Sequence, residues 1–395
     1  MKQVGTYWIQ PIQLGIVSSI LAVLQIANAA DFASSAAADS PKMRDPFTYD
    51  TTLTARDPLL WPFCQKSIWN MPIGNGAKYV PAELETPIEG TVTVDEDLII
   101  LRPTEPLMDV YYNDAGWKRN RDRLEITGGL IGRYPIPRSF EVSPDNWDGL
   151  TPNLGAAILM PDRRTIVQTQ PFAHGKNSAY ATSMDLIPDT DIYGDGYYGA
   201  HGGSGLSAIG GTIRIDELSP SSGPIRHVLK INLAGRRNCY YDDEVKGFRW
   251  PAITEDVDGP SHYGRERTKL VPIPKGCRVG ALFAIPATTN LDDIKFETIP
   301  GKMLAKAFQD YGAYYVDGTG WNVFAIETEW SPAGRFTTNF KNNWGFEFIS
   351  MKADNPWARD IAKIYAALCI VENNSPASIG GGGTPRAPLA PPFLK

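Results

Sequence analysis

The residue types best suited to acid/base chemistry gather in one segment of the chain, between Asp185 and Gly211. Acidic, phenolic and imidazole side chains are interleaved with glycines there, namely Asp185, Asp189, Asp191, Tyr193, Asp195, Tyr197, Tyr198 and His201, followed by Ser204. Glycine lets a backbone approach a ligand closely, and carboxylates beside a histidine can move protons on a polyol substrate. The segment therefore predicts a functional loop. The alternative is a surface loop whose Asp and Gly residues only form turns.

Each candidate residue has an expected role. We expect Asp195 and His201 to be the principal catalytic groups, with Asp191 and Tyr198 in support. The substrate-binding candidates are Arg214, Tyr197 and Trp147. A hydrolase would use paired carboxylates, and a lyase would use histidine and tyrosine as base and acid.

The same loop approaches a calcium motif without completing it. A calcium loop needs oxygen ligands at alternate positions, a glycine at the sixth position and a glutamate at the twelfth. In the segment that starts at Asp189, Gly194 is in place, but Tyr193 stands where Asp or Asn belongs and Ala200 stands at the twelfth position. This excludes a standard EF-hand. No metal or other cofactor is expected, and a looser calcium site that includes Asp195 is the alternative.

Three other site motifs are excluded by single departures. A G-x-S-x-G nucleophile elbow around Ser204 needs glycine where Leu206 stands. The glycine-rich run also differs from a dinucleotide fingerprint, because a strand rather than a helix is expected after it. The spacing of His174, His201, His227 and His262 fits no compact zinc signature. A serine esterase is therefore only a distant possibility.

Aromatic residues beside Asn, Asp or Gly indicate the substrate class. They are Tyr111, Tyr112, Trp117, Trp147, Tyr197, Tyr198, Trp250, Trp321 and Trp330, and exposed aromatic rings stack on apolar faces of partners. We therefore expect a polysaccharide or cell-surface glycan as the partner, and a glycoside hydrolase or polysaccharide lyase as the activity. The alternative is a non-catalytic extracellular carbohydrate-binding or cell-surface protein.

A succession of short motifs resembles a group of secreted, β-rich microbial proteins. The motifs are the Gly202–Leu206 loop (GGSGL), the Ile225–Leu229 strand (IRHVL), the Trp250–Ala252 segment (WPA) and the Gln309–Tyr314 helix end (QDYGAY). The resemblance covers roughly residues 150–330. It implies one β-rich exported domain and assigns no catalytic residue.

Short apolar runs punctuated by Pro and Gly predict a mainly β protein, with a single domain resembling a β-sandwich or jelly roll. Residues 91–94 and 98–101 are expected to be separate strands. In residues 228–233, Val228, Lys230 and Asn232 alternate with apolar residues, which predicts a half-buried strand. Two short helices are expected, over residues 302–312 and 356–368, the second with Asp354 as N-cap.

The two ends of the chain are distinct from this domain. Residues 1–29 have the basic start, the short apolar run and the small-x-small end of a secretory signal peptide. We expect a disordered lead-in over residues 30–56, the domain over 57–372, and a Gly/Pro-rich tail over 373–395 that is flexible or packs across the surface. The protein should therefore be secreted or periplasmic.

Charge and cysteine content restrict the partners further. The formal net charge is -6 and no basic cluster suggests a nucleic-acid groove. No second apolar stretch approaches the roughly 20 residues that a membrane helix needs, so no membrane is expected after signal cleavage. Export permits two disulfides among Cys64, Cys239, Cys277 and Cys369, and four buried thiols are the alternative.

Overall fold

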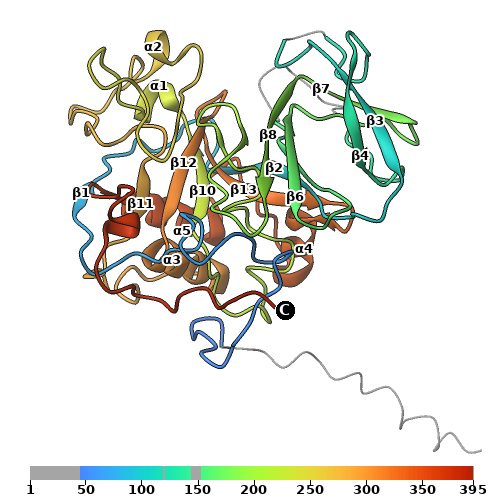
Figure 1. The fold of residues 1–395 in the computed structure, drawn as a ribbon. Helices are drawn as coiled ribbons and strands as arrows, with labels where there is room; N and C mark the ends of the chain where they lie inside the picture. Colours follow the sequence, from blue (N-terminus) through green and yellow to red (C-terminus); the bar gives the residue numbers. More distant parts are fainter. Residues whose placement is uncertain (1–44, 119–120, 144–152, 395) are drawn as a thin grey trace, which may run out of the picture. The chain divides into compact units, whose positions relative to one another are not determined.

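A large mixed sheet forms the centre of the protein. The computed structural model describes residues 45–118, 121–143 and 153–394, so the predicted signal peptide and most of the predicted lead-in lie outside the described residues. The sheet has 11 strands in the order β1-β15-β11-β12-β10-β13-β2-β5-β6-β8, and β14 pairs with β13 beside this path. A separate three-stranded sheet has the order β4-β3-β7 (Figure 1).

The strands are β1 (Tyr79–Pro81), β2 (Val92–Ile100), β3 (Leu107–Tyr112), β4 (Leu130–Pro135), β5 (Ala156–Leu159), β6 (Thr165–Gln170), β7 (Tyr180–Ser183), β8 (Asp185–Asp191), β9 (Tyr198–His201), β10 (Leu229–Leu233), β11 (Leu282–Ala284), β12 (Ala313–Gly318), β13 (Phe324–Ser331), β14 (Gly334–Arg335) and β15 (Cys369–Val371). The helices are α1 (Gly235–Asn238), α2 (Gly259–His262), α3 (Ile299–Asp310), α4 (Phe336–Trp344) and α5 (Pro356–Ala366), with a 3-10 turn at Ile379–Gly381.

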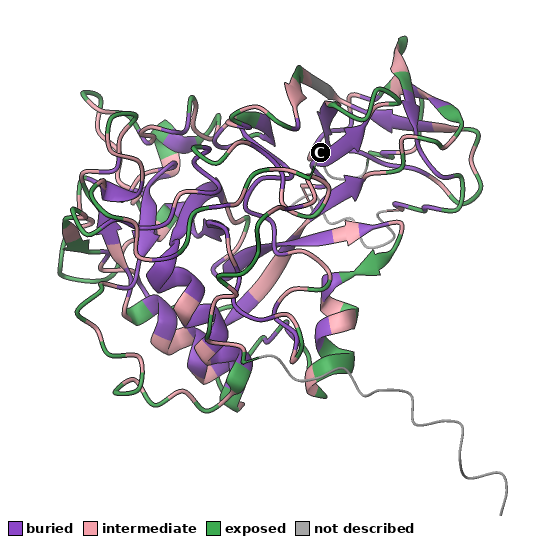
Figure 2. Ribbon diagram, turned by 60° about the horizontal axis from the view of Figure 1, so that its bottom comes forward, coloured by how far each residue is buried: buried purple, intermediate pink, exposed green. Residues whose placement is uncertain are grey.

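Both faces of the central strands are buried. In β12, Ala313 and Tyr315 belong to one apolar cluster, whereas Tyr314 and Val316 belong to another. The first cluster packs the sheet against side chains of α3, α4 and α5, including Phe308, Phe340 and Trp357. The second packs it against the segment around Trp69 and the loop that follows His201. Figure 2 shows the middle strands buried along nearly their whole length.

The two expected helices are present and begin at identifiable caps. In α3, the Thr298 hydroxyl accepts a hydrogen bond from the backbone N–H of Gly301 at 3.0 Å. In α5, the Asn355 side chain accepts one from the N–H of Ala358 at 2.9 Å, so Asn355 rather than Asp354 is the N-cap. Both caps satisfy N–H groups that a helix start leaves without partners. The nine-residue helix α4 was not predicted from the sequence.

The mainly β class is confirmed, but a jelly-roll sandwich is not. Eleven of the described strands form one large mixed sheet with helices against one face. Its central parallel pairs, β10–β12 and β13–β2, are covered on both faces. The C-terminal segment packs on the domain: the N–H of Arg386 donates to the carbonyl of Ile73. Part of the expected lead-in packs too, since Arg56 is buried and donates through Nε to the carbonyl of Pro391.

Two further features bear on the expectations for the exported protein. All four cysteines are unpaired in the structure, with Cys239 and Cys277 buried and Cys64 and Cys369 half-buried. Among the described residues, no helix is both long and apolar enough to cross a membrane.

One half-buried acid on β2 leads to a pH-dependent stability. Burial raises the pKa of Glu96 to about 7, although Arg335 lies 3.4 Å away and opposes the shift. Because the folded state then binds more protons than the unfolded state, unfolding free energy should fall as pH rises from about 4.5 to about 7. Over this pH range, the unfolding free energy of Glu96→Gln should fall by about 1–3 kcal/mol less than that of the unmodified protein. Urea unfolding at pH 5 and pH 8 measures this, and an equal pH dependence in both proteins would contradict it.

Candidate active site

Charged and amide side chains line one face of the sheet at its centre. They come from three adjacent strands: Asp95 and Asp97 on β2, Glu327 on β13, and Lys230 and Asn232 on β10. Strand register places Asp95 directly beside Glu327. In parallel and antiparallel pairs alike, alternate residues of a strand share a face. The sheet therefore holds a buried polar cluster where an apolar face would be ordinary.

A β-bulge brings Asp317 to the same face. Along β10 and β12, Leu229 pairs with Ala313 and Ile231 with Tyr315, but Asn232 pairs with Asp317 because the register shifts. The additional residue, Val316, reverses the alternation of β12 from that point. Bulges re-aim side chains in this way and are common beside functional sites.

An ion pair balances charge in the interior of the cluster. The Lys230 ammonium donates to Asp97 Oδ2 at 2.8 Å, to His201 Nε2 at 2.9 Å and to the carbonyl of Ser207 at 2.9 Å. Burial opposes ionisation of Asp97, but Lys230 and His201 outweigh it and lower its pKa. Burial, followed by the charge of Lys230, lowers the pKa of His201. The surroundings therefore favour ionisation of Asp97 and disfavour a positive charge on His201.

Burial disfavours ionisation of the other two acids of the cluster. Burial, reinforced by Asp95 and Asp97, raises the pKa of Glu327 well above its ordinary value. Burial likewise raises the pKa of Asp95. The Asn232 amide donates to Glu327 Oε1 at 2.7 Å and to Asp95 Oδ2 at 3.2 Å. Raised pKa values and hydrogen bonds from an amide together limit the cost of burying several carboxyl groups.

Three of these residues have the composition of a metal site but do not fit one. Asp97, His201 and Glu327 offer ligand atoms within 4.8 Å of one another. However, the Lys230 ammonium already contacts both Asp97 and His201 at hydrogen-bonding distance. A divalent cation held there would face this positive charge in a low-dielectric interior. Lys230 thus supplies the positive charge that a metal would otherwise provide.

Closer to the surface, Asp317 forms a carboxyl pair with Asp256. The two side chains are hydrogen-bonded to each other, which requires that one of them carry a proton. Burial and the neighbouring Asp256 charge raise the pKa of Asp317 well above its ordinary value, and burial raises that of Asp256. Two carboxyl groups in contact share a proton and titrate as a unit. We call Asp256 and Asp317 the carboxyl pair.

Neighbouring groups orient the carboxyl pair. The Tyr263 hydroxyl donates to Asp256 Oδ2 at 2.8 Å, and the N–H of Gly318 donates to Asp317 Oδ1 at 2.8 Å. A Cβ at Gly203 would lie 2.3 Å from Asp317 Oδ1 and 2.7 Å from Asp256 Oδ1. A side chain at position 203 would therefore collide with the carboxyl pair, so this position requires glycine. Its backbone brings the predicted loop directly against the carboxyl pair.

The carboxyl pair opens into a pocket of about 620 Å³. Aromatic, acidic, basic and amide side chains line it together with glycines: Trp117, Asn153, Gln170, Met184, Gly202, Gly203, Gly235, Arg236, Asp256, Val257, Asp258, His262, Tyr263, Asp317, Gly318, Thr319 and Gly320. A concave pocket of this size that contains titratable groups with perturbed pKa values is the expected form of an active site.

We expect Gly203→Ala to be strongly disruptive. Its Cβ would have to displace both carboxyl groups, and misplacing catalytic groups by about 1 Å can cost about a hundredfold in rate. Gly202→Ala is the matched control, because its Cβ would meet the terminal amide of the Gln170 side chain and not the carboxyl pair. Turnover and melting temperature of both variants provide the measurement. Equal activity in the two would show that the close packing of Gly203 is unimportant.

The structure separates the predicted catalytic residues. His201 is only 2% exposed and faces Asp97 and Lys230, so it lies in the interior and not at the surface of the predicted loop. The cause is β9, which carries the chain into the sheet layer before the glycine turn. Its contribution to the pocket is indirect: the carbonyl of His201 accepts hydrogen bonds from Ser204 and Gly205 and so holds the turn that contains Gly203.

Asp191, Asp195 and Tyr198 line a different groove, of about 570 Å³. Asp191 pairs with Arg164 at 2.5 Å, Asp195 is exposed, and Tyr198 is 52% exposed. These side chains do not converge with His201, whose ring nitrogen faces the sheet. The predicted loop therefore borders two hollows, with Gly202 and Gly203 in one and its acidic residues in the other.

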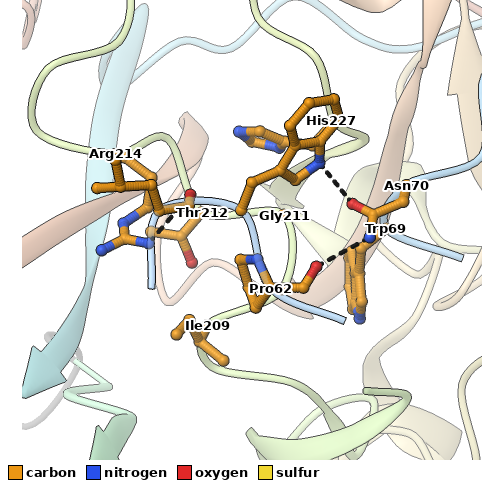
Figure 3. A pocket seen from close by; sticks show the side chains of 11 residues that line it. Pro62, Trp69, Asn70, Ile209, Gly211, Thr212, Arg214 and His227 are labelled. Atoms are coloured by element: carbon orange, nitrogen blue, oxygen red, sulfur yellow. Dashed lines mark hydrogen bonds between the residues drawn. The ribbon is translucent and has the colours of Figure 1, made fainter. Parts of the chain in front are cut away.

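The predicted substrate-binding residues are dispersed. Arg214 is bound to Glu329 at 2.7 Å and to the carbonyl of Leu59 at 2.8 Å. It lines a hollow of only about 10 Å³, which Figure 3 shows bordered by Trp69, Asn70 and His227; such a space holds at most a water molecule. Tyr197 packs edge-on against Trp250. Trp147 lies outside the described residues.

Sequence reasoning missed the carboxyl pair and the buried acids. A signal was present, because acidic residues interrupt apolar runs in Val94–Leu98 and in Val316–Gly318. The run at residues 91–101 was expected to be two strands, but β2 continues through Asp95, Glu96 and Asp97. Acids inside a strand that is buried on both faces must be paired or protonated. No comparable local signal distinguishes Asp256.

Comparison with known proteins adds no family or activity. No protein-family model matches the chain, and searches of curated proteins and of solved structures give no similar protein. The resemblance to secreted, β-rich microbial proteins therefore stays a prediction, and the site must be interpreted from its own geometry.

Proposed function

We propose that this protein is a secreted hydrolase that cleaves polysaccharide, with the carboxyl pair Asp256–Asp317 as its proton donor. The observation that carries the proposal is two hydrogen-bonded carboxyl groups with raised pKa values at the wall of a pocket of about 620 Å³. A carboxyl group held protonated near neutral pH is the usual general acid for a glycosidic oxygen. Export is supported by the signal-peptide pattern of residues 1–29.

A second carboxylate in the pocket supplies the matching base. Asp258 is 60% exposed and lies 2.9 Å from His262 Nδ1. In the proposed reaction a water oxygen bonds to the anomeric carbon as the glycosidic C–O bond breaks. Asp258 accepts the proton of the water, and the carboxyl pair protonates the leaving oxygen. Asp256 and Asp317 cannot themselves be the separate acid and base, because those groups lie about 5 Å or more apart in glycosidases.

The direct contact within the pair favours a second candidate, hydrolysis of an amide bond. Aspartic proteases use two carboxyl groups that share one proton to activate water and protonate the substrate carbonyl. The hydrogen bond between Asp256 and Asp317 has this form. In that case Asp258 would be dispensable, whereas glycoside hydrolysis requires it.

The experiment is a substrate screen of the protein recovered from the medium, with paired variants. Release of reducing ends from a polysaccharide panel is measured beside release of amines from a denatured polypeptide. Loss of reducing-end release in both Asp317→Asn and Asp258→Asn supports the glycoside hydrolase, with Asp292→Asn, which lies outside both hollows and pairs with Lys302, as the control. Amine release that needs Asp317 but not Asp258 supports the amide hydrolase. Retention on a glycan without any cleavage, or no interaction with either panel, overturns both.

The groove that contains Asp191, Asp195 and Tyr198 is a candidate surface for binding a sugar chain. An exposed tyrosine beside carboxylates can contact a sugar chain outside the reacting pocket. We retain non-catalytic glycan binding at this groove as the alternative function. Calcium binding by these carboxylates and disulfide formation after export also stay proposals.

A further inference from the structure

We propose that Asn153 is a positioning residue for the carboxyl pair and that Trp117 fixes its orientation. This inference rests on the proposed role of the carboxyl pair. Both residues line the pocket. The Asn153 Nδ2 group donates to Asp317 Oδ2 at 3.2 Å and to Asp95 Oδ2 at 2.5 Å. An amide nitrogen has two hydrogens, so Asn153 uses both of them to connect the pair to the buried cluster.

The orientation of this amide is determined by its third contact. The Trp117 Nε1–H donates to Asn153 Oδ1 at 2.9 Å. An indole N–H can only donate, so it excludes the rotated amide in which Nδ2 would face the indole. With Oδ1 held by Trp117, Nδ2 must face the two carboxyl groups. The backbone N–H of Asn153 lies 3.4 Å from Asp95 Oδ1 and adds a second connection to β2.

The amide donor favours ionisation of the pair. A hydrogen bond to a carboxylate stabilises its charged form, and Asp317 accepts such bonds from Asn153 and from the N–H of Gly318. The other groups that face the pair are the Tyr263 hydroxyl and the acids Asp95 and Asp258. Since both acids oppose a further negative charge, the two donors to Asp317 are needed for the pair to release a proton during turnover.

Asp95, on β2, connects Asn153 to the buried polar cluster. It accepts hydrogen bonds from Asn153 and from Asn232, which itself binds Glu327 on the neighbouring strand. Asn153 therefore holds Asp317 at a defined distance from β2. Trp117 combines two roles, because its ring forms pocket wall and its N–H orients the amide.

The test measures carboxyl ionisation directly as well as activity. Aspartate side-chain carbons are labelled with carbon-13, and the signals of the pair are identified by their loss in Asp317→Asn and Asp256→Asn. In Asn153→Ala the ionisation of the pair should move upward by about one to two pH units. Trp117→Phe keeps the aromatic ring and removes the donor, so a smaller shift in the same direction is expected. Asn339→Ala, whose amide binds the carbonyl of Ile215 outside the pocket, is the control.

The outcomes separate this inference from the proposed function. An unchanged titration in Asn153→Ala with a folded protein overturns the positioning role, whatever the activity. A shifted titration in a protein that hydrolyses nothing supports the positioning role and overturns the hydrolase. If Asn153→Ala does not fold, Asn153→Gln and Trp117→Phe carry the test. A parallel upward displacement of the pH–rate profile then supports the proposal, and a loss of rate at all pH values without displacement opposes it.

Discussion

Replacing Asp317 by asparagine should reduce turnover by about a hundredfold to ten-thousandfold, which is the usual cost of removing an essential acid/base group. Asparagine has the same shape and cannot transfer the shared proton. One of its hydrogens can still donate to Asp256, so the pocket should keep its form. Because its Nδ2 would face either the N–H of Gly318 or the amide of Asn153, unfolding free energy should fall by about 1 kcal/mol. The measurement is kcat and kcat/KM beside urea unfolding.

The matched variants are Asp256→Asn and Asp292→Asn. The first should lose turnover as Asp317→Asn does, because the pair acts as a unit. The second breaks a surface ion pair with Lys302 and should change stability by less than about 1 kcal/mol. Full activity in Asp317→Asn would remove the carboxyl pair from the reaction.

The largest effect on stability is expected from Lys230→Met. Lys230 is fully buried and is the cation bound to Asp97. Removing one partner of a buried ion pair leaves an uncompensated charge and typically costs about 3–5 kcal/mol. The double variant Lys230→Met/Asp97→Asn should recover part of this loss, since neither charge then remains. Urea unfolding at pH 7 provides both values.

A double variant no more stable than Lys230→Met alone would contradict the charge balance described for the cluster. Lys230→Arg is a useful companion, because it retains the charge but requires more volume in a closely packed site. Partial stability in Lys230→Arg would show that charge rather than shape dominates.

Local elements of the fold were predictable because local chemistry determines them. The apolar spacing of Trp357, Ile361 and Ile364 is typical of a helix and agrees with the helix predicted over residues 356–368. The strand at residues 229–233 was also predicted from its alternation. Its burial was predicted wrongly, since Lys230 and Asn232 face a buried polar cluster rather than solvent. Period-two alternation shows that two faces differ in polarity, and it does not show which face meets water.

The candidate site could not be assembled from sequence because its parts are distant in the chain. Asp95, Asp256 and Asp317 come from β2, from the loop before α2 and from the end of β12. The strand order separates β12 and β2 by β10 and β13. This order brings Asp95 and Asp317 within hydrogen-bonding distance of the Asn153 side chain. The predicted loop lies beside a hollow, but it contributes glycine backbone to the carboxyl pair rather than acidic or imidazole side chains.

The central claim is that the pair Asp256–Asp317 holds a proton at neutral pH in a pocket open to substrate. Infrared difference spectroscopy of the carboxyl stretch measures this directly, with the unmodified protein compared with Asp317→Asn and Asp256→Asn across pH 4 to 9. We predict a protonated-carboxyl band at pH 7 that is absent from both variants and disappears only as pH rises further. A pair fully ionised at pH 7 would contradict the account.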